Sequence, residues 1–153
     1  SKNKKLNLSD TIINELQLDD WLNLLFSEII QPQLVGDTPW IIFNYPASQA
    51  ALAKKSMVNG ELIARRFEVF YKGIELGNGY HELTDPIEQR ARFEEDNRVR
   101  KSLGKPVMPI DENLIAALEN GLPKCAGIAI GLDRLLMLKQ NKKSINDVIL
   151  FVD

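Results

Sequence analysis

Two glutamates in the segment 65–83 have the types and spacing to hold a divalent cation. Lys72-Gly73 can form a two-residue turn between two strands, which places Glu68 and Glu75 as diagonal neighbours on one face. Reference positions of such neighbours lie about 7–8 Å apart. Carboxylates this close repel unless a cation lies between them, and Mg²⁺ binds carboxylate oxygens together with substrate phosphates. The segment therefore predicts a Mg²⁺ site, and a solvated sheet face balanced by basic neighbours is the alternative.

A third glutamate, Glu82, follows the glycine-rich break Gly77-Asn78-Gly79. Glycine adopts backbone conformations closed to other residues and lets a ligand approach the chain closely. Asn78 and Glu82 could therefore recognise an ammonium group together with a carboxylate or an amide.

The stretch Gly127–Leu138, GIAIGLDRLLML, holds the remaining candidates. Glycine is unfavourable in strands, so its use here suggests a close backbone approach. Arg134 begins the following helix, where a planar cation could stack on a base and contact phosphate oxygens. The helix N-terminus would add partial positive charge. The alternative is a tight strand–helix joint with an ion-paired arginine.

An α+β fold, with a mostly antiparallel sheet flanked by helices, is expected to position these groups. The predicted strands are Trp40–Tyr45 (buried), 65–72, 74–77, 127–131 and 148–152. The predicted helices are 10–16, 20–30 (capped by Asp19 or Asp20), 85–103, 111–120 and 133–140 (capped by Asp133). The charged helix 85–103 is interpreted as a solvated, ion-paired face. Its basic residues could instead contact an acidic protein or tRNA.

Composition excludes several other classes. The 153 residues are 44% hydrophobic and 26% charged with a net charge of −2, so no global basic field attracts nucleic acid. One cysteine, Cys125, excludes an internal disulfide, and with the single His81 it cannot form a Zn²⁺ site. The apolar runs are too short to span a membrane and the N-terminus lacks a secretory signal. A cytoplasmic protein is expected.

Together these stretches resemble the C-terminal half of the catalytic domain of lysyl-type class II synthetases. GIAIGLDRLLML resembles motif 3 of that family, a glycine-rich strand followed by G-x-D-R and an apolar helix. RFEVF and GIELGNGYHEL resemble the preceding element, and DVILF at 147–151 also matches. The resemblance runs from about Trp40 to Phe151.

The resemblance implies an ATP site. Glu68 and Glu75 would hold Mg²⁺ on ATP. Arg134 would pack on the adenine and reach the γ-phosphate, so that Arg134 and Glu75 are the expected catalytic residues. Gly131 would line the ATP pocket.

The resemblance also implies an amino-acid site. Asn78 and Glu82 would contact the substrate, with Glu82 as the partner of its side-chain ammonium. Gly127 and Ala129 would line the floor of this pocket.

A finer resemblance is to the paralogues of lysyl-tRNA synthetase that attach β-lysine to elongation factor P. It is carried by FNYPASQAALA, GYHELTDPIEQRARFEEDN and PIDENLIAALENGLPKCAGIAIGLDRL. Ala129 is usually glycine in lysyl-tRNA synthetases, and its methyl group could change which lysine isomer fits. Leu52-Ala53-Lys54, in contrast, retains a synthetase-like L-A-K.

The expected activity is ATP-dependent formation of a lysyl- or β-lysyl-adenylate, followed by transfer to a lysine of elongation factor P. Charging of lysine tRNA and a non-catalytic nucleotide- or partner-binding module are the alternatives. Motifs 1 and 2 of the family are not found in residues 1–153. The chain is therefore expected to be a single domain, the C-terminal portion of a catalytic domain, and inactive in isolation. The parent is expected to be a homodimer without membrane association.

Overall fold

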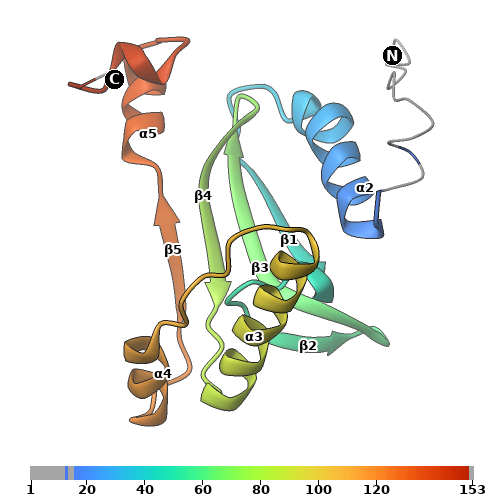
Figure 1. Cartoon of the computed structure of the whole chain (residues 1–153). Helices are drawn as coiled ribbons and strands as arrows, with labels where there is room; N and C mark the ends of the chain where they lie inside the picture. The colour runs from blue at the N-terminus through green and yellow to red at the C-terminus, as the bar shows by residue number, and fades with distance from the viewer. Residues whose placement is uncertain (1–12, 14–15, 152–153) are drawn as a thin grey trace. The chain divides into compact units, whose positions relative to one another are not determined.

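The computed structural model describes residue 13 and residues 16–151 of the chain (Figure 1). Within these residues it contains five β-strands and four α-helices. The strands form one sheet in the order β1-β3-β4-β5, and β2 also pairs with β3. The predicted α+β class with an antiparallel sheet is confirmed. None of the described helices combines the length and the apolar character needed to cross a membrane.

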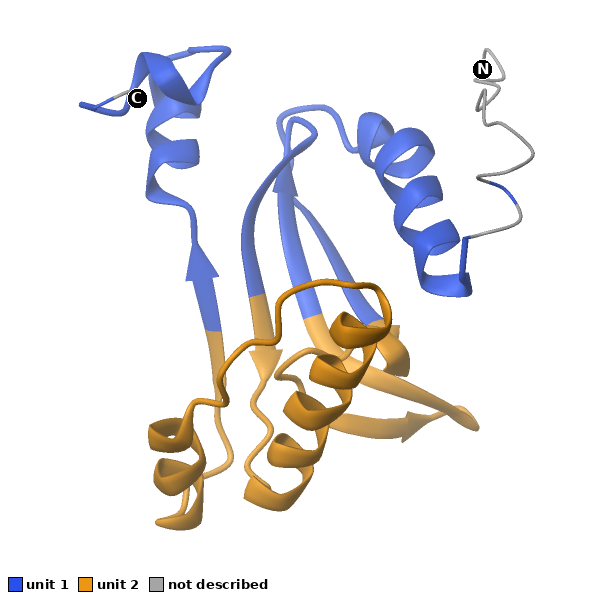
Figure 2. Ribbon diagram, viewed as in Figure 1, with its two compact units in different colours: residues 1–44, 67–78, 128–153 blue, residues 45–66, 79–127 orange. Residues whose placement is uncertain are grey.

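The chain divides into two compact units (Figure 2). Unit 1 comprises residues 1–44, 67–78 and 128–153, and unit 2 comprises residues 45–66 and 79–127. Strands β1, β3, β4 and β5 each pass from one unit into the other along their length.

Two tight hairpins organise the sheet. The first joins β2 (Lys55–Val58) to β3 (Glu61–Tyr71) through Asn59-Gly60, with antiparallel register Val58↔Glu61. The second joins β3 to β4 (Ile74–His81) through Lys72-Gly73. Both residues of each turn have positive φ, 51° and 86° in the first and 51° and 78° in the second, as type I′ hairpin turns require. The predicted turn at Lys72-Gly73 is confirmed, whereas β2 was not predicted.

In unit 1, α2 (Leu18–Leu25) continues into a π-helical turn, Phe26–Ile30. The Phe26 ring lies 5.5 Å from that of Phe70, which is buried at the end of β3. This contact packs the helical segment on the hairpin. The predicted cap of α2 was wrong: Gln17 is the N-cap, and Asp20 accepts a hydrogen bond from its backbone N–H.

An exposed ion pair further fastens the hairpin of unit 1. The Nζ of Lys72 lies 3.0 Å from Oδ1 of Asp37. The hydrogen bond from Lys72 and its positive charge lower the pKa of the Asp37 carboxyl. The same hydrogen bond and charge of Asp37 raise the pKa of Lys72. Gln31 also donates to the carbonyl of Gly73, so the turn is held from two sides.

Strand β1 (Trp40–Pro46) forms where it was predicted, but the predicted burial is wrong. Trp40, Ile41 and Phe43 are 46%, 59% and 66% exposed. An apolar run records a preference for burial. Whether the strand is buried depends on which other segments cover it.

The C-terminal part of unit 1 contains the end of β5 (Ala126–Ile130) and α5 (Leu132–Lys139). Gly131, not Asp133, is the N-cap of α5. The predicted strand at 148–152 is also wrong, because residues 148–151 form no strand and Leu150 is 91% exposed. An isolated segment has no ladder partner to make it a strand. Most of the predicted helix 10–16, and Val152, lie outside the described residues.

Unit 2 contains α3 (Pro86–Ser102) and α4 (Glu112–Glu119). Asp85 and Asp111 cap them by accepting backbone N–H hydrogen bonds. Both helices match the prediction to within two residues. One buried cluster of this unit consists of Ala50, Ala53 and Ala64, with Tyr45 and Tyr80 packed against it.

Candidate active site

In unit 1, β4 and the start of α5 bring Glu75 and Arg134 together. Arg134 Nη1 donates to the backbone oxygen of Glu75 at 2.8 Å and to its Oε2 at 3.4 Å. The N–H of Gly131 donates to the carbonyl of Leu76 at 2.9 Å, which ties the joint between β5 and α5 to β4. A β-carbon on Gly131 would lie 3.3 Å from Cδ of Arg134. Glycine at 131 therefore leaves room for the aliphatic part of the Arg134 side chain.

Glu68 lies on β3 and is 9% exposed. A carboxylate with so little contact with water needs compensating partners, because burial disfavours its charge. The alternative of a solvated sheet face is therefore wrong for Glu68. The Glu75 side chain, in contrast, is 36% exposed.

Within unit 1, Gly77, the first glycine of the Gly77-Asn78-Gly79 break, lies close to strand β5. A β-carbon on Gly77 would lie 3.0 Å from the Ala129 carbonyl oxygen and 3.0 Å from Cδ1 of Ile128. The sequence predicted close approach here and attributed it to a ligand. In the structure the glycine admits the neighbouring strand β5, which contains Ala129. Asn78 is half-buried on β4.

In unit 2, Glu82 is held directly after the end of β4. Its N–H donates to the carbonyl of Cys125 at 3.0 Å, and Ala53 pairs with it in an isolated antiparallel bridge. A β-carbon on Gly127 would lie 2.7 Å from Oε1 of Glu82. Glycine at 127 therefore makes space for this carboxylate.

The predicted site residues thus fall into two groups. Unit 1 contains Glu68, Glu75, Asn78, Ala129, Gly131 and Arg134, and unit 2 contains Glu82 and Gly127. The structure brings Glu75 to Arg134 in the first group and Glu82 to Gly127 in the second.

The acidic residues fit a metal that arrives with a ligand. In the part of the chain that the structure describes, no three His, Cys, Asp or Glu side chains gather to hold a metal ion. Mg²⁺ commonly uses one or two carboxylates plus substrate phosphates, which is what Glu68 and Glu75 can supply. The side-chain contact of Glu75 with Arg134 is long at 3.4 Å. This hydrogen bond is weak at such a distance, so the Glu75 carboxylate can also contact a cation.

Arg92 was assigned to the solvated, ion-paired face of the charged helix, and its contacts with backbone carbonyls were not predicted. Its side chain is only 14% exposed and donates to the carbonyls of Ala51 and Ala53. The spacing of Glu88 and Arg92 is a readable signal for an ion pair, and that pair is present. The two carbonyl partners are distant in sequence, so no local sequence pattern predicts these hydrogen bonds.

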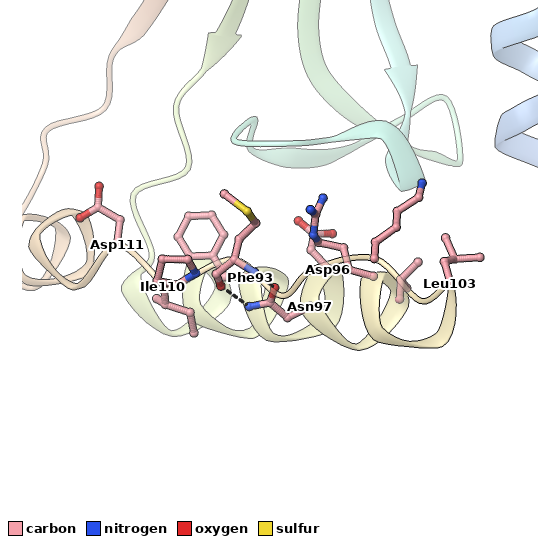
Figure 3. Close-up of a pocket in the computed structure, with 11 residues that line it drawn as sticks. Phe93, Asp96, Asn97, Leu103, Ile110 and Asp111 are labelled. Atoms are coloured by element: carbon pink, nitrogen blue, oxygen red, sulfur yellow. Dashed lines mark hydrogen bonds between the residues drawn. The ribbon is translucent and has the colours of Figure 1, made fainter.

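A pocket of unit 2 lies between α3 and residues 103–111 (Figure 3). Its volume is about 530 Å³. Asn97 and Met108 exchange two hydrogen bonds across its wall, of 2.8 and 2.9 Å. Its lining residues are Phe93, Asp96, Asn97, Val99, Arg100, Leu103, Lys105, Met108, Pro109, Ile110 and Asp111. No predicted site residue is among them.

Comparison with known proteins gives a consistent result. The family described as tRNA synthetases class II (D, K and N) matches residues 26–153. Proteins named elongation factor P–(R)-β-lysine ligase are 52% identical in Klebsiella pneumoniae, 50% in Hamiltonella defensa and 48% in Edwardsiella ictaluri, each over 147 residues. Each alignment covers 96% of this chain. The chain spans 45% of the length of these curated relatives.

Proposed function

This chain belongs to the class II tRNA synthetase family (D, K and N), and from this premise we propose that its protein activates lysine or β-lysine with ATP and transfers it to a lysine of elongation factor P. The observation that carries the proposal is the 52% identity, over 96% of this chain, to proteins named for β-lysine ligation to elongation factor P. By the family resemblance, the full-length protein acts as a cytoplasmic homodimer.

The first step is adenylate formation. A carboxylate oxygen of the amino acid bonds to the α-phosphorus of ATP, and the bond to the bridging oxygen of the β-phosphate breaks and releases pyrophosphate. The nucleophile is already ionised, so the step needs no general base and depends on positioning and charge stabilisation. In the second step the acceptor amine attacks the acyl carbon, AMP leaves, and the amine loses a proton.

Unit 1 supplies the groups for the nucleotide. Glu68 and Glu75 would hold Mg²⁺, which neutralises phosphate charge when bound. The Arg134 side chain is 45% exposed while its Nη1 is anchored on the Glu75 carbonyl. An anchored and accessible guanidinium suits stacking on adenine and contact with the γ-phosphate. Gly131 keeps the space beside it open.

The amino acid is assigned to the remaining groups. By the family resemblance, Glu82 of unit 2 offers a carboxylate to the side-chain ammonium of the substrate, with Gly127 beside it. The resemblance also assigns a substrate contact to the amide of Asn78. Ala129 is exposed on β5, so its methyl group is available to contact a substrate.

The proposal is tested by amino-acid-dependent ATP–pyrophosphate exchange with the full-length protein, comparing (R)-β-lysine with α-lysine. Acyl transfer to elongation factor P and to lysine tRNA is then measured in parallel. We expect preferential exchange with β-lysine and transfer to the protein. Efficient charging of tRNA with α-lysine, without transfer to elongation factor P, would establish the synthetase alternative. Nucleotide binding without any exchange would establish a non-catalytic module.

A further inference from the structure

Arg92 on α3 is bonded to a loop that is distant in sequence. Its Nη1 donates to the carbonyl oxygens of Ala51 and Ala53, both at 2.8 Å. Its Nε donates to Oε1 of Glu88 at 3.1 Å, and its Nη2 pairs with the same oxygen. Glu88, on the same helix, therefore orients the guanidinium, which is hydrogen-bonded to two carbonyls of the loop.

This loop runs beside the chain that contains Glu82. Ala53, fully buried, pairs with Glu82 in an antiparallel bridge. On one side of the bridge the N–H of Leu83 donates to the carbonyl of Leu52 at 3.0 Å. On the other side the N–H of Lys54 donates to the carbonyl of His81 at 2.8 Å. The backbone position of Glu82 thus depends on the position of residues 52–54.

The loop is not in a conformation that it would hold by itself. Ala51 has φ of 47°, in the left-handed region that an L-residue other than glycine adopts rarely and at a cost. Such a conformation persists only where the surroundings impose it. Arg92 bonds the carbonyl of Ala51 itself, so it is one of the groups that impose it.

We propose that Arg92 is a positioning residue for amino-acid recognition. By holding residues 51–53 it fixes the backbone of Glu82 and aims the Glu82 carboxylate at the side-chain ammonium of the substrate. The inference rests on the proposed function, since the role of Glu82 is part of that function. Gly127 makes room for the carboxylate in its present orientation, because a β-carbon at 127 would lie 2.7 Å from Oε1 of Glu82.

A positioning role and a purely structural role differ in what they change. If the Glu82 carboxylate is no longer held in position, KM for β-lysine rises. The kcat/KM preference for β-lysine over 3-aminohexanoic acid, which is β-lysine without the terminal amine, then falls. KM for ATP stays unchanged. Loss of folded protein lowers the rate with both amino acids equally and leaves the advantage intact.

The test compares Arg92→Met with Arg90→Met in the full-length protein. Arg90 lies on the same helix and forms a surface ion pair with Glu112, so it is a matched control. We expect the kcat/KM preference for β-lysine over 3-aminohexanoic acid to fall at least tenfold in R92M and to stay within twofold in R90M. Arg92→Lys should recover little, because one ammonium does not reproduce the planar fork.

Two further variants sharpen the test. Glu88→Gln removes the charge that orients Arg92 while retaining the arginine, so it should reduce the preference less than R92M does. It carries the measurement if R92M does not fold. Ala51→Gly in the R92M background should restore part of the preference, because glycine adopts positive φ without the same cost.

The outcomes separate this inference from the function on which it rests. If Glu82→Gln abolishes the preference while R92M and E88Q keep it within twofold, the positioning role is wrong and the proposed function stands. If E82Q itself keeps the preference, the assigned role of Glu82 is wrong and the inference about Arg92 falls with it.

Discussion

A β-carbon on Gly127 would lie 2.7 Å from Oε1 of Glu82. Real β-carbons do not approach other atoms so closely, so any larger residue at 127 must move the carboxylate. The atom displaced is the tip of a flexible side chain, and moving it does not require the backbone to shift. A larger residue at 127 should therefore alter the position of the Glu82 carboxylate, and hence function, with little effect on stability.

Gly127→Ala is therefore expected to impair activity while preserving the fold. Displacing a substrate-binding group by about 1 Å can cost a factor on the order of 100, so we expect kcat/KM for the amino acid to fall about 10- to 100-fold. Pyrophosphate exchange gives the activity and thermal unfolding gives Tm, which should change little. Adding Glu82→Asp, which shortens the displaced side chain, should recover part of the loss. A large fall in Tm with unchanged KM would contradict this account.

Gly77→Ala should have the opposite consequence. The new methyl group would meet the Ala129 carbonyl oxygen and Cδ1 of Ile128, each at 3.0 Å. A backbone atom cannot move aside without disturbing the pairing of β4 with β5. We expect a loss of about 1–3 kcal/mol in the free energy of unfolding, as for other overpacked sites. Urea denaturation measures it, with G127A as the matched control. Equal destabilisation by the two substitutions would refute the distinction.

Local signals in the sequence were sufficient for most elements and for the strand–helix joint. Asp85 and Asp111 are capping residues with immediate neighbours as partners, and Lys72-Gly73 is a turn defined by two residues. The joint at Gly131 and Arg134 was likewise recognisable from residues close in sequence. Each of these features has a signal within a few positions of the chain, which a single sequence records.

Features that depend on distant segments were not predicted. β2 (Lys55–Val58) was missed although Asn59-Gly60 is a strong hairpin signal, because residues 56–64 were assigned to no element. The burial of Glu68, the exposure of Trp40 and the grip of Arg92 on the loop 51–53 all depend on which segments pack together. Such packing has no local pattern.

Glu75→Gln tests the assigned Mg²⁺ site. The amide retains the shape of the side chain but lacks its charge, and the bond from Arg134 to the Glu75 backbone oxygen is unaffected. Stability should therefore be maintained while the Mg²⁺ concentration for half-maximal exchange rises several-fold. Glu61→Gln, at the exposed start of β3, is the control. An unchanged Mg²⁺ dependence in E75Q would remove Glu75 from the proposed site.

Ala129→Gly tests the choice between lysine isomers. One methyl group in a pocket is worth about 1–3 kcal/mol in discrimination, roughly 10- to 200-fold. We expect the ratio of kcat/KM for α-lysine to that for β-lysine to rise at least tenfold. Ala126→Gly is the control. Ala126 is also exposed on β5 and lies three positions before Ala129, so the substitution removes a methyl group from the opposite face of the strand. A ratio that changes equally in both variants would exclude contact with the substrate as the cause.

The ion pair between Arg90 and Glu112 predicts a pH dependence of stability. Arg90 makes a two-pronged contact with Glu112 that joins α3 to α4. The hydrogen bond from Arg90 and its charge lower the pKa of the Glu112 carboxyl below its ordinary value of 4.5. A carboxyl whose pKa is depressed in the folded state stabilises the protein above its unfolded pKa and loses this contribution as the pH falls through the folded value.

Glu112→Gln should therefore slightly lower Tm at neutral pH, and the difference from the unsubstituted protein should vanish well below pH 4.5. High salt should also shrink the difference at neutral pH, because the pair is exposed. A Tm difference that is independent of both pH and salt would show that the substitution acts through packing and not through the ion pair.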